Sequence, residues 1–100
     1  MHTPLLAAVL VAVATTAQAQ SPDPNFARNA AAACANCHGT NGTSKGGMPS
    51  LAGQPKAELV RKMQAYKGGT LTGTIMPQLA KGYSDQEIDR MAGWFAAQKP

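Results

Sequence analysis

The sequence predicts an all-α domain of three to five short helices. Apolar residues recur at helical spacing in three segments, and no segment shows the sustained two-residue alternation of a half-buried strand. Stretches rich in glycine and proline separate the three segments, as is typical of loops. No internal repeat is visible, and the chain of 100 residues is long enough for one domain only.

The first predicted helix covers residues 26–36, which are rich in alanine, the residue with the highest helix propensity. At helical spacing, one face carries Phe26, Ala30, Ala33, Cys34 and Cys37. Gly39 is well suited to end this helix. Because its side chains are small, we expect another helix to cross it closely.

The second predicted helix has Pro55 at its first position and ends at Gly68-Gly69. Loops are expected before it, over residues 39–54, and after it, over residues 70–83. Its apolar face is formed by Leu59, Met63 and Tyr66.

The last predicted helix follows Ser84, and Glu87 three residues later completes a capping box. Its apolar stripe consists of Ile88, Met91, Ala92 and Phe95.

The N-terminus has the pattern of a cleaved secretory signal peptide. Residues 5–14 are an unbroken apolar run, and Ala17-Gln18-Ala19 is a small-x-small cleavage pattern. The sequence thus predicts a signal over residues 1–19 and a mature domain over residues 20–100 that begins at Gln20. An uncleaved anchor is the alternative, but this run is shorter than the roughly twenty apolar residues that span a bilayer. Export predicts a periplasmic protein with no stable membrane insertion after cleavage.

Cys34-Ala35-Asn36-Cys37-His38 is the most informative segment. Two cysteines two residues apart, followed directly by histidine, form the C-x-x-C-H attachment pattern of c-type haem. The two thiols can reach the two vinyl groups of one haem, and His38 can reach its iron. The remaining apolar residues include many alanines, so a covalent haem would supply hydrophobic surface that this small chain lacks.

Other roles for the two cysteines are less favoured. A disulfide between them would close only a very short loop, which stabilises little. A thioredoxin-like redox pair would leave His38 unexplained and lacks a surrounding βαβ pattern. A structural zinc site needs four ligands, and the mature chain offers two cysteines and one histidine.

With this motif, the chain resembles a small class I cytochrome c. Three further segments are similar to the cytochrome subunit of flavocytochrome c sulfide dehydrogenase, in its monohaem form: Thr74-Ile75-Met76, Leu79-Ala80-Lys81-Gly82-Tyr83-Ser84 and Met91-Ala92-Gly93-Trp94-Phe95. The resemblance implies a class I cytochrome c fold, with the helices wrapped around one covalent haem c. It also implies a flavoprotein partner that carries covalent FAD, oxidises sulfide and passes electrons to the haem.

The resemblance also bears on the ligands of the iron. It implies that the loop after the motif wraps the histidine side of the haem, where a carbonyl near Pro49 would accept the second ring proton of His38. Pro49 shaping a turn is the equal alternative. Thioether sulfur is the common partner of histidine in cytochromes c. Met76 is the expected second axial ligand because it lies in a glycine-flanked loop, ahead of Pro77 and well before the last helix, and can therefore cross to the face opposite His38. Met48 is the reserve, whereas Met63 and Met91 lie in helical apolar stripes.

These features predict one-electron transfer in the periplasm, with His38 and Met76 on the iron and Cys34 and Cys37 attached to the haem. The chain is not expected to be catalytic alone, since no catalytic triad, carboxylate pair or phosphate loop is visible. The alternative to a sulfide dehydrogenase subunit is a freely diffusing shuttle between a reductase and a terminal oxidase.

The formal charge of +4 is diffuse, which argues against nucleic-acid binding. Some lysines could steer a redox partner, although a merely solvated surface explains any one of them better: Lys45, Lys56, Lys62, Lys67 and Lys81. Tyr83 and Trp94 are candidates for an apolar contact patch or for packing against haem.

Overall fold

The computed structural model describes residue 12 and residues 23–100. Within these residues the chain forms four α-helices and one 3-10 turn and contains no strand, so the all-α prediction is confirmed. The predicted signal peptide, residues 1–19, lies outside the described residues except for residue 12. No helix in the described part of the chain is long and apolar enough to cross a membrane.

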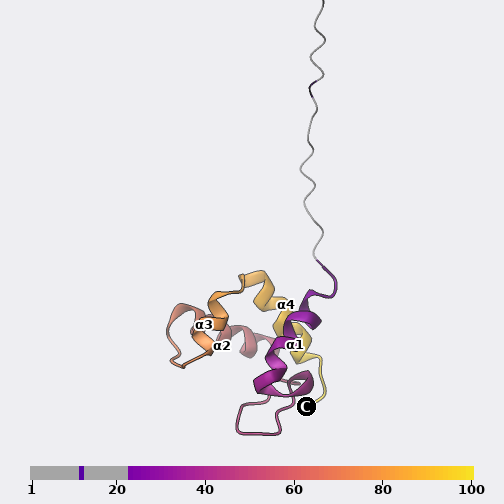
Figure 1. The fold of residues 1–100 in the computed structure, drawn as a ribbon, viewed down its shortest axis with the longest axis vertical. Coiled ribbons are helices and arrows are strands. Elements are labelled where there is room, and N and C mark those ends of the chain that lie inside the picture. The colour runs from indigo at the N-terminus through magenta and orange to yellow at the C-terminus, as the bar shows by residue number, and fades with distance from the viewer. Residues whose placement is uncertain (1–11, 13–22) are drawn as a thin grey trace, which may run out of the picture.

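The elements follow one another along the chain as Figure 1 shows. In order they are α1 (Phe26–His38), η1 (Thr40–Gly42), α2 (Lys56–Gly68), α3 (Met76–Lys81) and α4 (Asp85–Ala96). Helix α1 packs against α4 and η1, and α2 packs against α3 and α4. Helix α4 therefore joins the two halves of the domain.

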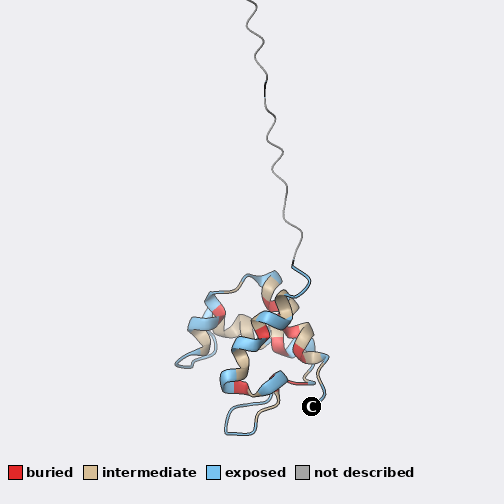
Figure 2. Ribbon diagram, turned by 45° about the vertical axis from the view of Figure 1, so that its right-hand side comes forward, coloured by how far each residue is buried: buried red, intermediate tan, exposed pale blue. Residues whose placement is uncertain are grey.

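The core lies where α1, α2 and α4 meet. Ala31, Leu59, Ala92 and Phe95 form its central cluster, and the buried positions in Figure 2 fall largely along these helices. Two of these four side chains are alanine, and small side chains allow helix axes to approach closely. The predicted close crossing of the first helix by another helix is thus confirmed.

The buried face of α1 differs from the predicted one. Ala31 is 2% exposed and belongs to the core, whereas Ala33 is exposed to solvent. Phe26, Ala30 and Cys34 are half-buried. The helix therefore turns Ala31 toward α4. The spacing of the alanines alone could not predict which face is buried, because the segment contains five consecutive small residues before Ala35.

Helix α2 begins at Lys56, so Pro55 is its N-cap and not its first residue. Gly69 ends it in the left-handed conformation with φ 86°, as favoured at this position by glycine. Leu59 is buried on its inner face, and Met63 and Tyr66 are half-buried.

The prediction of a loop over residues 70–83 was wrong in part, because α3 occupies six of these residues. Pro77 sits at its second position, where a missing N–H costs no helical hydrogen bond. The N–H groups of Gln78 and Leu79 donate to the carbonyl of Ile75, at 2.9 and 3.0 Å. So short a helix leaves little periodicity to detect.

Helix α4 confirms both predicted signals. The Ser84 hydroxyl accepts from the Glu87 N–H at 3.1 Å, and the Glu87 carboxylate accepts from the Ser84 N–H at 2.8 Å. This reciprocal pair is the capping box. The predicted stripe is buried at all four positions: Ile88, Met91, Ala92 and Phe95.

Candidate functional site

Cys34 and Cys37 lie in the last turns of α1, three residues apart and therefore on one side of the helix. Cys34 is half-buried and packs against the core, and Cys37 is exposed. Both are free thiols. One cysteine thus lies beside the core and the other at the surface. This arrangement suits a flat group that is attached to both cysteines along the helix.

Burial raises the pKa of the Cys34 thiol; a backbone hydrogen bond partly opposes this, and the nearby Cys37 adds a smaller increase. A redox-active cysteine of the thioredoxin type requires a lowered pKa, since the thiolate is the nucleophile. The environment of Cys34 therefore disfavours the thioredoxin-like alternative.

His38 ends α1 and is only 8% exposed. Its Nδ1 lies 2.6 Å from the carbonyl oxygen of Pro49. Because a carbonyl can only accept, Nδ1 carries the proton and Nε2 presents its lone pair. The hydrogen bond to Pro49 is the one that the resemblance implied, and it is now observed.

His38 Nε2 is buried and has no hydrogen-bond partner. An unpaired buried polar atom costs about 1–3 kcal/mol, and such atoms are rare enough to require an explanation. An iron ion bound to Nε2 would satisfy this atom, while a carbonyl holds Nδ1 as in many metal-binding histidines. Among residues 23–100, no three His, Cys, Asp or Glu side chains gather in a way that could hold a metal ion by themselves. The donor set therefore fits an iron that arrives in a porphyrin.

The turn after α1 brings Pro49 to His38. Gly39 has φ 86° and Gly42 has φ 82°, backbone conformations that glycine adopts without strain. The Gly42 carbonyl accepts from the N–H groups of Leu51 and Ala52, at 2.8 and 3.1 Å. These bonds return the loop to the end of α1, so that the Pro49 carbonyl meets the imidazole.

Gly42→Ala is expected to destabilise the domain by more than the about 1–3 kcal/mol typical of a strained backbone position. A Cβ there would lie 2.7 Å from the Phe95 ring and 3.0 Å from the Ala52 nitrogen, so the core would also have to shift. Urea unfolding of the holoprotein measures the effect. The matched control is Gly46→Ala, which meets nothing within 4 Å. Equal unfolding midpoints for the two variants would contradict this role of Gly42.

Met76 is the first residue of α3 and is half-buried. Its helix packs against α2, whereas His38 belongs to α1, beside α4 and η1. In Figure 1, α3 and the C-terminal end of α1 lie in different parts of the domain. The two predicted ligands thus come from separate elements of the domain.

The other methionines of residues 23–100 are less well placed for this role. Met48 directly precedes Pro49, whose carbonyl binds the His38 ring, so it lies on the histidine side, and it is 45% exposed. Met91 is buried on the core face of α4, and Met63 is half-buried on α2. Met76 as the second ligand stays a prediction, with Met48 as the reserve.

Among the described residues, the exposed large apolar side chains are Met48, Leu71, Ile75 and Leu79. Exposure was predicted for none of them: Met48 is the reserve ligand, and Ile75 and Leu79 belong to the segments that carry the resemblance. Tyr83 and Trp94 are instead half-buried, and Trp94 packs against the core, edge-on to Phe95. In the sequence, apolar residues on the outer side of a helix form the same pattern as apolar residues that face the core, so their exposure could not be predicted.

Three of the five lysines considered for contact with a partner are engaged within the chain. Lys56 pairs with Asp89 at 2.9 Å, Lys62 donates to Gln54 at 3.4 Å, and Lys67 donates to the Tyr83 carbonyl at 2.7 Å. Lys45 and Lys81 are exposed and remain the better candidates for contact with a partner.

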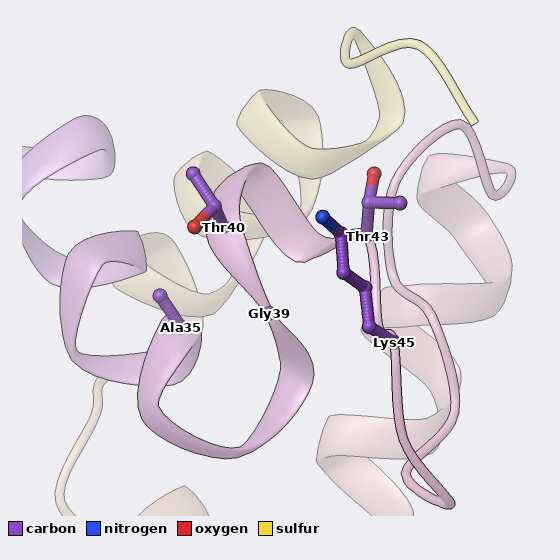
Figure 3. A pocket seen from close by; sticks show the side chains of 5 residues that line it. All are labelled: Ala35, Gly39, Thr40, Thr43 and Lys45. Atoms are coloured by element: carbon purple, nitrogen blue, oxygen red, sulfur yellow. The ribbon is translucent and has the colours of Figure 1, made fainter.

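A pocket of about 310 Å³ lies beside the end of α1 (Figure 3). Ala35 and Thr40 border one side of Gly39, and Thr43 and Lys45 lie on the other. The lining combines polar and apolar surface, and none of the four predicted haem residues contributes to it. Ala35 nevertheless belongs to the C-x-x-C-H motif and Gly39 follows His38, so the pocket adjoins the candidate haem site.

Comparison with known proteins identifies the family of the chain. The family model described as "Cytochrome C oxidase, cbb3-type, subunit III" matches residues 22–95. Residues 22–95 include the C-x-x-C-H motif and Met76. The match covers well over half of the chain.

Several curated proteins are similar to this chain. The cytochrome subunit of sulfide dehydrogenase from Chlorobaculum tepidum is 39% identical over 62 residues, which are 62% of this chain and 56% of that protein. Cytochrome c4 from Pseudomonas aeruginosa is 36% identical over 95% of this chain and 48% of its own length. The thiosulfate dehydrogenase electron acceptor of Stutzerimonas stutzeri is 30% identical over 97% of this chain and 48% of its own length.

The chain spans about half the length of these relatives. The all-helical fold and the match over residues 22–95 nevertheless place it in one family. The chain belongs to the cytochrome c family and is a class I cytochrome c, a haem c protein of electron transfer that resembles the cytochrome subunit of sulfide dehydrogenase.

Proposed function

We propose that this cytochrome carries one haem c, joined by thioether bonds to Cys34 and Cys37, with its iron held by His38 Nε2 and Met76 Sδ. The buried, unpartnered Nε2 of His38 is the observation that carries this proposal. The Pro49 carbonyl holds the ring from the other side at 2.6 Å, which fixes the tautomer and the direction of the lone pair.

Bound haem would supply a one-electron couple between ferric and ferrous iron. The residues of the chain tune it: Met76 raises the reduction potential, and the Pro49 carbonyl increases the basicity of His38. If His38 and Met76 both hold the iron, an external substrate would find no free place on it. The site therefore serves electron transfer and not catalysis by the chain alone.

The proposed donor is the FAD-containing subunit of a sulfide dehydrogenase, with the flavin on that partner and not on this chain. The similarity to the sulfide dehydrogenase subunit of Chlorobaculum tepidum supports it, together with the segments 74–76, 79–84 and 91–95. Sulfide would reduce the flavin, and the haem would take electrons from it one at a time.

A freely diffusing shuttle is the second candidate. It is favoured by the matches to cytochrome c4 and to the thiosulfate dehydrogenase electron acceptor, which extend over 95% and 97% of the chain. A shuttle forms small, brief contacts. The exposed Lys45 and Lys81 would then steer it toward acidic partner surfaces.

The proposed location is the periplasm, after removal of residues 1–19. The apolar run and the Ala17-Gln18-Ala19 pattern support export. The mature protein would begin at Gln20.

Isolation of the tagged chain from its native cells tests the partner. We expect periplasmic material that begins at Gln20 and co-purifies with an FAD protein in a fixed ratio, and we expect sulfide to reduce its haem. A sulfide-treated sample without the flavoprotein is the control. A monomer that stays oxidised with sulfide, in fractions free of flavin, would reject the subunit role and leave the shuttle.

A further inference from the structure

We propose that Lys67 is a positioning residue that holds the segment carrying Met76 against α2, and thereby limits how readily the Met76 thioether leaves the iron. The inference rests on the proposed ligand role of Met76. It concerns residues 70–84, the segment between α2 and the first turn of α4.

Both ends of this segment are tied to α2. At its start, the Thr70 and Leu71 N–H groups and the Thr70 hydroxyl donate to the Ala65 carbonyl, at 2.9, 3.1 and 3.2 Å. At its end, Lys67 Nζ donates to the Tyr83 carbonyl at 2.7 Å. The two ties use residues only two positions apart on one helix, so they close the segment into a loop with its ends together.

Asp85, the first residue of α4, strengthens the second tie. Its Oδ1 accepts from Lys67 Nζ at 3.2 Å and from Gln64 Nε2 at 2.9 Å. The Gln64 hydrogen bond and then Lys67 hold the pKa of the Asp85 carboxyl below its ordinary value. We call Gln64, Lys67, Asp85 and the Tyr83 carbonyl the α2 clasp.

Lys67 is the central member of the α2 clasp. Its side chain is 29% exposed, whereas that of Asp85 is 78% exposed, so water weakens the ion pair far more than the bond to the carbonyl. A hydrogen bond from an ammonium to a carbonyl is charge-assisted and short, as 2.7 Å indicates. Loss of Asp85 should therefore matter less than loss of Lys67.

Between the two ties the segment packs against α2 through α3. Only Ala80 of the segment is buried, whereas Leu71, Ile75 and Leu79 are exposed. Gly73 also lies close to Tyr66 of α2 and to Pro77. Because so few side chains of the segment are buried, the ties at its ends add to the packing of α3 in holding Met76, and release of one end would let the thioether move away more readily.

Imidazole binding to the ferric holoprotein tests this inference, because imidazole must displace the thioether. Lys67→Met keeps the apolar stem and removes the donor, and we expect it to bind imidazole roughly tenfold more tightly, the size expected from loss of one charge-assisted hydrogen bond. Lys67→Arg should restore most of the wild-type affinity. Lys62→Met is the matched control: it lies on the same helix but donates to Gln54, outside the segment.

Urea unfolding of the same variants separates positioning from general stability. The inference is upheld if imidazole affinity rises in Lys67→Met and not in Lys62→Met. It is overturned if Lys67→Met lowers the unfolding midpoint but binds imidazole like wild type. Met76→Ala distinguishes the two proposals through the far-red sulfur-to-iron charge-transfer band. If Met76→Ala loses this band while Lys67→Met binds imidazole like wild type, the α2 clasp alone is rejected. If Met76→Ala keeps the band, the Met76 ligand is rejected and the α2 clasp with it.

Discussion

Replacing both Cys34 and Cys37 by serine is expected to abolish covalent haem retention and cooperative folding together. A serine hydroxyl cannot form the thioether bond, so haem would be lost on denaturation. The described residues bury only four large apolar side chains, namely Leu59, Ile88, Met91 and Phe95. A domain of this size buries about 60% of its unfolded surface and is marginal without a covalent or metal support.

Two measurements check this prediction: haem staining of the denatured protein and thermal unfolding followed by circular dichroism. The single variants Cys34→Ser and Cys37→Ser are the controls, since each keeps one thiol for attachment. We expect intermediate haem retention for the singles. A colourless double variant that unfolds cooperatively at the wild-type temperature would contradict the view that the haem completes the core.

Met76→Ala is expected to remove the far-red sulfur-to-iron charge-transfer band while the covalent haem stays in place. It should also lower the reduction potential by on the order of 0.1 V, a fraction of the roughly 0.8 V over which axial ligands tune haem iron. The reason is that thioether ligation favours ferrous iron, and alanine leaves that position to water or another ligand.

Met48→Ala is the matched control for Met76→Ala, because Met48 is exposed beside Pro49 and should leave both the band and the potential unchanged. Optical spectra and redox titration of the two purified variants give the comparison. If the band disappears in Met48→Ala and persists in Met76→Ala, the ligand is Met48.

The helices that could be predicted from the sequence are those with local signals. The capping box of Ser84 and Glu87 and the stripe through Ile88 and Phe95 define α4 almost to the residue. Gly39 and Gly69 mark the ends of α1 and α2 for the same reason, since glycine readily adopts the positive φ found there. Such features depend on neighbours within one or two turns.

The features that sequence reasoning missed depend on contacts between distant segments. Helix α3 is short and packs against α2, so its existence is decided by that contact and not by its own pattern. The register of α1 is decided by α4, which buries Ala31 and not Ala33. Gly42 is required by the Phe95 ring, which lies more than fifty residues away in sequence.

The candidate site likewise has residues that the sequence predicts and residues that it does not. The C-x-x-C-H motif identifies Cys34, Cys37 and His38 directly, because their spacing is itself the chemical requirement. The contact of Pro49 with His38 rested on resemblance and is now an observed hydrogen bond. The α2 clasp could not be predicted, because the sequence does not distinguish Lys67 from the other surface lysines. What distinguishes it is the hydrogen bond to the Tyr83 carbonyl.

The most direct measurement is the mass of the purified periplasmic protein after denaturation and organic extraction of free haem, read together with its reduced-minus-oxidised spectrum. We expect the mass of the bare mature polypeptide plus one haem, and the sharp bands of a c-type cytochrome. A folded protein with the bare polypeptide mass and no absorbance in the visible range would contradict attachment at Cys34 and Cys37.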